Sequence, residues 1–119
     1  HPDGKTMKAV CFTAYGKTPD ALSVMSIPKP SVESPNEVLI KVHACALNPI
    51  DKSRLSGGLS LIFPEEYDTI VLGYDVAGTI EEAGEDASKS YSAGDEVFVR
   101  LAGLKYGAMA EYVVCTTAE

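Results

Sequence analysis

The chain has 119 residues, 45% of them hydrophobic, so it fits one domain that can bury a core. Its 17 acidic and 10 basic residues give a net charge of −7, and no Lys/Arg cluster offers the concentrated basic face that nucleic acid or an anionic membrane requires. No apolar run approaches the ~20 residues of a membrane-spanning helix and no signal peptide is visible, so we expect a cytoplasmic protein.

The N-terminal third is predicted to hold two strands and a proline-rich loop. Residues 1–6 are expected to be a vector-derived remnant or a short native tail, because Met7 begins a natural-looking start. Residues 8–12 form a short apolar strand, and 22–27 alternate apolar and polar side chains with the period of a half-buried strand. Regular structure then stops at a run of prolines, namely Pro28, Pro30 and Pro35.

In the middle of the chain we predict the longest strand, over 37–47, followed by the clearest signal for the start of a helix. Two faces alternate along that strand, with Val38, Ile40 and Val42 on one and Leu39, Lys41 and His43 on the other. Asn48 can cap a helix, Pro49 suits its first position, and the charge of Asp51 favours the helix dipole. The glycines at 57 and 58 end this helix, and a loop follows over 59–70.

The C-terminal half predicts three more strands, over 76–80, 96–100 and 110–114, separated by turns that contain glycine. Many short strands with Gly/Pro turns and one or two short helices are typical of an irregular β-barrel or sandwich. We therefore predict a mainly β fold.

The three cysteines are isolated and odd in number, which argues against a disulfide framework and favours a reducing compartment. His43 and Cys45 alternate on one strand and so share a face, but two ligands do not make a zinc site. Cys45 is predicted to be a small core residue.

Six motifs occur in a fixed order along the chain. They are Met7–Val10 with Tyr15-Gly16, Asn36–Val42, Asn48–Asp51, Gly73–Gly78, Ala93–Val97 and Gly107–Tyr112. In this order they resemble the N-terminal GroES-like domain of the medium-chain dehydrogenases/reductases, and most of all the zinc-independent quinone and enone oxidoreductases. The resemblance covers the chain from Met7 onward, so we expect a GroES-like catalytic domain over 7–119.

The resemblance implies a GroES-like irregular β-barrel packed against a Rossmann domain, with the active site between the two. It implies hydride transfer from NADPH to a small quinone or enone, and a homodimer formed through the Rossmann domain. That domain would begin beyond Glu119 and bind most of the NADP(H), since no G-x-G-x-x-G motif occurs here. The 119 residues alone are therefore predicted to be inactive.

The same resemblance implies that both zinc sites of the zinc-dependent relatives are absent. Those relatives have a Cys where this chain has Asn48 and a His where it has Tyr74, and a catalytic zinc needs three protein ligands. Their four clustered structural cysteines have no counterpart in 102–107. We expect no metal.

The resemblance also nominates site residues. Asn48 would lie beside the nicotinamide and the substrate, with Pro49 next to it on the cofactor side, or Asn48 would only cap the helix. Tyr74 would donate a hydrogen bond to a substrate carbonyl, or form an aromatic wall of the cleft, and Tyr67 would border the substrate. Ser53 stands where relatives carry a Tyr or Lys proton donor, which leaves that donor unassigned.

Four other charged residues are expected to have mainly structural roles. Lys52 and Arg54 are expected to be solvated charges, Asp51 to bond the backbone, and Asp75 to hold a turn. Two alternatives stay open, a non-catalytic GroES-like binding or scaffold module, which the serine at position 53 favours, and an alcohol dehydrogenase-like enzyme. A co-chaperonin subunit is disfavoured, because the motifs belong to reductases.

Overall fold

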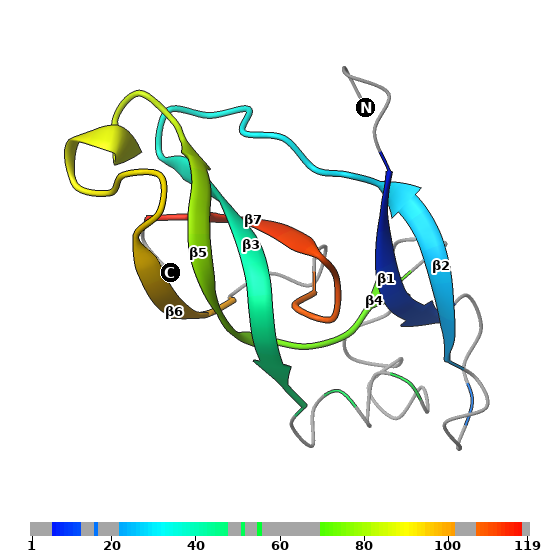
Figure 1. Cartoon of the computed structure of the whole chain (residues 1–119). Coiled ribbons are helices and arrows are strands. Elements are labelled where there is room, and N and C mark those ends of the chain that lie inside the picture. Colours follow the sequence, from blue (N-terminus) through cyan, green and yellow to red (C-terminus); the bar gives the residue numbers. More distant parts are fainter. Residues whose placement is uncertain are drawn as a thin grey trace, which may run out of the picture.

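The computed structural model describes residues 6–12, 16, 22–47, 51, 55, 70–101 and 107–117. Two antiparallel sheets lie beside each other (Figure 1). The three-stranded sheet has the order β2-β1-β4, and the four-stranded sheet has the order β6-β5-β3-β7. The elements are β1 (Thr6–Phe12), β2 (Ser23–Pro28), β3 (Glu37–Ala46), β4 (Ile70–Val71), β5 (Asp75–Ala83), the 3₁₀ helix η2 (Ala87–Lys89), β6 (Glu96–Arg100) and β7 (Tyr112–Thr116).

The predicted mainly β fold is confirmed, and the described strands are consistent with a GroES-like domain although they do not close into a full barrel. The strands predicted over 8–12, 22–27, 37–47 and 96–100 are present within two residues of the predicted ends. The last strand begins at Tyr112 rather than 110, because Ala110 pairs only with Ala9 across the two sheets. Of the predicted helix, Asp51 and Leu55 are helical, and its other residues lie outside the described ones.

The regular alternation predicted for 37–47 is wrong beyond Val42. Val42 faces Gly78 on β5, but Ala44 faces Ala77, so His43 is an extra residue in β3. Such a bulge breaks the period of two and changes which side chains share a face. The side chains from His43 to Leu47 are all exposed.

The prediction that Cys45 is a core residue is therefore also wrong. Cys45 is exposed, whereas Cys11 and Cys115 are buried. Cys45 lies opposite Val76, which belongs to the main core, yet the Cys45 residue is exposed and its thiol is only partly shielded by neighbouring atoms. The buried part of β3 ends before the strand itself ends, and a pattern of apolar residues cannot indicate where burial stops.

The main core packs against the four-stranded sheet. Ten buried residues form this cluster, namely Val38, Ile40, Tyr74, Val76, Ile80, Ala87, Leu101, Ala108, Val113 and Cys115. Two smaller clusters of three residues lie at the three-stranded sheet, and Met109 packs against both. Residues 107–110 thus connect the two sheets, and Val10 donates its N–H to the Met109 carbonyl at 2.8 Å.

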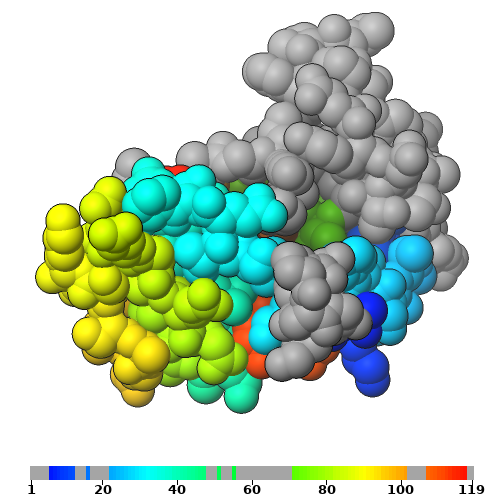
Figure 2. All heavy atoms as spheres, turned by 90° about the horizontal axis from the view of Figure 1, so that it is seen from above, coloured from blue at the N-terminus to red at the C-terminus, as the bar shows by residue number. Residues whose placement is uncertain are grey.

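The linker between β2 and β3 packs against the turn that follows β5. The backbone N–H groups of Asp86 and Ala87 both donate to the Pro35 carbonyl, each at 2.9 Å. Figure 2 shows this turn at one end of the molecule, next to the linker. At the other end of the linker, the Lys29 Nζ lies 4.0 Å from the centre of the Tyr112 ring. Within the described residues, no helix is long and apolar enough to cross a membrane.

Candidate functional site

Asp51 links two of the sequence motifs, Asn48–Asp51 and Gly73–Gly78. Its Oδ1 accepts a hydrogen bond from the Gly73 N–H at 2.8 Å, across 22 residues of sequence. The Asp51 side chain is 2% exposed and is the one buried polar or charged side chain among the described residues. A charged acceptor in this position binds the N–H strongly and ties the residues after Asn48 to the turn before Tyr74.

A third segment lies against the same turn. Gly73 has φ +100°, a conformation that favours glycine, and its carbonyl accepts the Ala108 N–H at 3.0 Å. The Met109 N–H donates to the Leu72 carbonyl at 2.9 Å. A Cβ on Gly107 would collide with the carbonyl oxygens of Val71 and Leu72, so only glycine allows this approach. The motifs that contain Asp51, Gly73 and Gly107 therefore converge, although they lie far apart in sequence.

Tyr74 is buried, at 5% exposure, and belongs to the main core cluster. Its carbonyl accepts the Leu101 N–H at 2.6 Å, which fixes the start of β5 against the end of β6. The side chain thus packs where the core meets the Asp51–Gly73 bond. Its predicted contact with a substrate carbonyl stays a prediction.

The other predicted site residues, Asn48, Pro49, Ser53 and Tyr67, lie outside the described residues. The same holds for Lys52 and Arg54. Asp75 is half-buried at the start of β5, opposite Ala46 on β3 and Arg100 on β6. In the part of the chain that the structure describes, no three His, Cys, Asp or Glu side chains gather to hold a metal ion.

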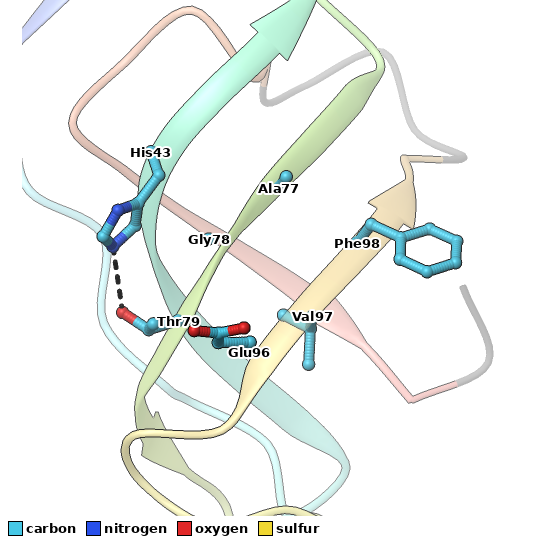
Figure 3. Close-up of a pocket in the computed structure, with 7 residues that line it drawn as sticks. All are labelled: His43, Ala77, Gly78, Thr79, Glu96, Val97 and Phe98. Carbon is cyan, nitrogen blue, oxygen red and sulfur yellow. Dashed lines mark hydrogen bonds between the residues drawn. The ribbon is translucent and has the colours of Figure 1, made fainter.

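The outward face of β3, β5 and β6 is open next to these segments. A hollow of about 460 Å³ lies between His43 and Phe98, where the His43 Nε2 is 3.3 Å from the Thr79 Oγ1 (Figure 3). A second hollow of about 570 Å³ shares Ala77 and Phe98 with the first and extends to Ala46 and Arg100. Leu47, the described residue that follows Ala46, is 53% exposed.

Sequence reasoning missed the exposure of Phe98, which is 90% exposed. The signal was present, because in a strand with period two Phe98 shares its face with Glu96 and Arg100. Two charged residues on one face indicate solvent on that side.

The electrostatic surroundings of Cys45 make its thiol a poor nucleophile. Partial burial, and then the negative charge of Asp51, raise the pKa of the Cys45 thiol. A higher pKa lowers the thiolate fraction at neutral pH. At neutral pH, covalent chemistry through Cys45 is therefore disfavoured.

Comparison with known proteins gives a consistent result. Residues 34–119 match the family model described as the alcohol dehydrogenase GroES-like domain. The chain is 37% identical over 110 residues to the chloroplastic quinone-oxidoreductase homolog of Spinacia oleracea, covering 92% of this chain and 32% of that protein. It is 33% identical over 129 residues to the mitochondrial NAD(P)H oxidoreductase RTN4IP1 of Homo sapiens, covering 99% of this chain and 32% of that protein.

Among solved structures, the quinone oxidoreductase from Coxiella burnetii superimposes with a TM-score of 0.78 at 33% identity. The superposition covers 95% of this chain and 35% of that chain. The chain thus spans about a third of the length of the curated relatives it matches. On the match to residues 34–119, this chain belongs to the alcohol dehydrogenase GroES-like domain family.

Proposed function

We propose that this chain is the substrate-side catalytic domain of an NADP(H)-dependent, zinc-independent oxidoreductase that reduces quinones or conjugated enones by hydride transfer. The observation that supports this most is the Asp51–Gly73 hydrogen bond, which joins the segment after Asn48 to the segment before Tyr74. The names of the relatives, which include quinone oxidoreductases and NAD(P)H oxidoreductases, point the same way. Their greater length leaves room for a nucleotide-binding domain.

In this proposal, Asn48 and Tyr74 hold the acceptor carbonyl. The Asn48 side-chain oxygen can cap the helix while its NH₂ donates to the substrate. Asn48 and Pro49 face the nicotinamide, and Tyr67 borders the substrate. NADP(H), when bound, supplies the hydride, and the protein supplies position and hydrogen bonds. Donors aimed at the carbonyl oxygen stabilise the negative charge that develops there.

The open face beside Ala46 and Leu47 fits a ligand that enters from that side, because these residues are exposed up to position 47. Asn48 and Tyr74 are poor zinc ligands, which supports metal-free chemistry. In this proposal Ser53 takes the sequence position of the relatives' Tyr or Lys as a weak hydroxyl donor, and the final proton otherwise comes from solvent or from a neighbouring group. A cytoplasmic location belongs to the same proposal and is tested by cell fractionation.

The test is NADPH oxidation with 1,4-benzoquinone or an enone by the complete protein that carries this chain. We expect Asn48→Ala to lower kcat about 10²-fold, as the loss of one oxyanion donor does, and Tyr74→Phe to lower it less. Tyr91→Phe is the matched control, since Tyr91 lies near η2, and should keep full activity. Activity that disappears with a chelator and returns with zinc would contradict the metal-free proposal. Equal rates with NADH would contradict the NADP(H) preference.

The 119-residue chain alone is expected to show no NADPH oxidation. A non-catalytic binding module is the second candidate, favoured by the serine at position 53 in place of a stronger proton donor. Saturable quinone binding without turnover in the complete protein would support that candidate. Turnover that falls with Asn48→Ala would exclude it.

A further inference from the structure

The Asp51 carboxylate lies in the interior of the molecule. The side chain is 2% exposed, and further residues of a longer chain could only cover it more. A buried carboxylate costs free energy unless hydrogen bonds compensate for the lost water, so its partners are specific. One partner is the Gly73 N–H, at 2.8 Å and 22 residues away in the sequence. This connection therefore does not depend on which surfaces of the chain are open.

A second segment holds the same turn. The Gly73 carbonyl accepts the Ala108 N–H at 3.0 Å, and the Leu72 carbonyl accepts the Met109 N–H at 2.9 Å. The Met109 carbonyl accepts the Val10 N–H in turn, which attaches this segment to β1. The N–H and the C=O of Gly73 are thus both bonded, and the two bonds hold the turn in its conformation with φ +100°.

Both residues that are proposed to hold the acceptor carbonyl lie next to this connection in the sequence. Tyr74 follows Gly73 directly, and Asn48 precedes Asp51 by three residues. Three residues of fully extended chain span at most ~11 Å, so the Cα atoms of Asn48 and Asp51 can lie no farther apart than that. The Asp51–Gly73 bond therefore limits how far the segments of Asn48 and Tyr74 can move apart.

We propose that Asp51 is a positioning residue, which sets the separation of Asn48 and Tyr74 by accepting the Gly73 N–H. Its consequence for catalysis rests on the proposed function, in which those two side chains hold one carbonyl oxygen. Two donors stabilise the developing charge together only where both reach that oxygen, and a misplacement of about 1 Å can lower a rate about 10²-fold. Asp51 contacts neither substrate nor cofactor in this proposal and acts through the backbone.

The first test measures the connection itself, by amide hydrogen exchange of the complete protein with mass spectrometry. Asp51→Ala removes the acceptor and should make peptides that contain Gly73 and Ala108 exchange about tenfold faster or more. Asp95→Ala is the matched control, because the Asp95 Oδ2 also accepts a backbone N–H at 2.8 Å, that of Ser92. Asp95 lies in the turn between η2 and β6, at the other end of β5 (Figure 1), so its variant should leave exchange at Gly73 unchanged.

The second test measures NADPH oxidation by the complete protein with 1,4-benzoquinone or an enone. Asp51→Ala should lower kcat about 10- to 100-fold and change KM less than about threefold. Asp51→Asn keeps an oxygen that can accept the N–H and should recover most of the rate, and Asp95→Ala should keep all of it. In an Asn48→Ala background, Asp51→Ala should have a much smaller effect, because Asp51 acts through the position of Asn48.

The outcomes separate this inference from the proposed function. Unchanged exchange at Gly73 in Asp51→Ala, or a wild-type kcat, overturns the positioning role and leaves the function standing. Losses of Asn48→Ala and Asp51→Ala that simply add also overturn it, since each residue then acts alone. Faster exchange at Gly73, in a protein whose wild type oxidises no NADPH with either substrate, supports the Asp51 connection and overturns the proposed function instead.

Circular dichroism identifies a variant that fails to fold. If Asp51→Ala does not fold, Asp51→Asn decides the question, because its neutral oxygen is a weaker acceptor than a carboxylate. It should show smaller changes of the same sign, namely faster exchange at Gly73 and a lower kcat. An Asp51→Asn protein identical to wild type in both measurements would then overturn the proposal.

Discussion

At the residue scale, the Asp51 carboxylate is buried and accepts a hydrogen bond from a distant backbone N–H. A buried carboxylate that accepts a backbone N–H compensates part of the cost of its burial and leaves no unsatisfied donor at Gly73. The position of this aspartate three residues after Asn48 predicted a role at the helix start. Its partner, 22 residues away, could not be predicted, because nothing local in the sequence encodes which distant N–H faces a buried acceptor.

Asp51 should also control the reactivity of Cys45. The pKa of Cys45 is raised by partial burial and by the Asp51 charge, so at pH 8 less thiolate is present than in an ordinary exposed thiol. We expect Cys45 to react slowly with a disulfide reagent, with a rate that rises toward more alkaline pH. Asp51→Asn removes the charge, lowers the pKa of Cys45 and should speed the reaction at pH 8, while the asparagine oxygen can still accept the Gly73 N–H.

The reaction is followed by the absorbance of the released thiol between pH 7 and 10. Cys45→Ser is the control that removes the signal, because Cys11 and Cys115 are buried. An Asp51→Asn rate equal to wild type across this range would show that the Asp51 charge does not reach the thiol.

At the scale of elements, the connection between β4 and β5 determines how the three motif segments meet. Gly73 and Gly107 are glycines for different reasons, one for its positive φ and the other for close backbone approach. The sequence predicted the strands near these glycines, because strand patterns are local. It did not predict the extra residue His43, since an inserted residue looks like any other until its partner strand is known.

Alanine substitutions at Gly73 and Gly94 distinguish the cost of an unfavourable backbone conformation from the cost of close packing. Gly94 has φ +94° and open space where a Cβ would lie, so Gly94→Ala should cost only about 1 kcal/mol of unfolding free energy. Gly73→Ala has the same backbone cost and would place its Cβ 3.1 Å from the Ala108 Cβ. We expect a loss of about 2–3 kcal/mol, measured by urea unfolding with unchanged m-values. Equal losses for the two variants would mean that residues 107–109 shift freely.

At the scale of the whole molecule, the two sheets differ in the size of the buried clusters that pack against them. The four-stranded sheet encloses a cluster of ten buried residues, whereas each cluster at the three-stranded sheet has three. The family, the mainly β fold and most strand positions were predictable from motif order and alternation. The relative size of the two cores was not, because it depends on how the sheets curl in space.

This asymmetry predicts a hierarchy of hydrogen exchange. Amides of β3 and β5, which are central strands over the main core, should exchange slowest. Amides of β2, an edge strand whose side chains are exposed or half-buried, should exchange fastest among the strands. The measurement is exchange at pH 7 by NMR or mass spectrometry, with a difference of about tenfold for each 1.4 kcal/mol of local stability. Uniform protection across both sheets would indicate a single cooperative unit instead.

The meeting of Asp51, Gly73 and Ala108 has a consequence for the order of folding. Hairpins between neighbouring strands close short loops, but these contacts close loops of 22 residues and more. The candidate site should therefore assemble late, after the β5–β6 hairpin has formed. A ligand that binds there would stabilise contacts absent from the folding transition state, so it would slow unfolding far more than it would speed folding.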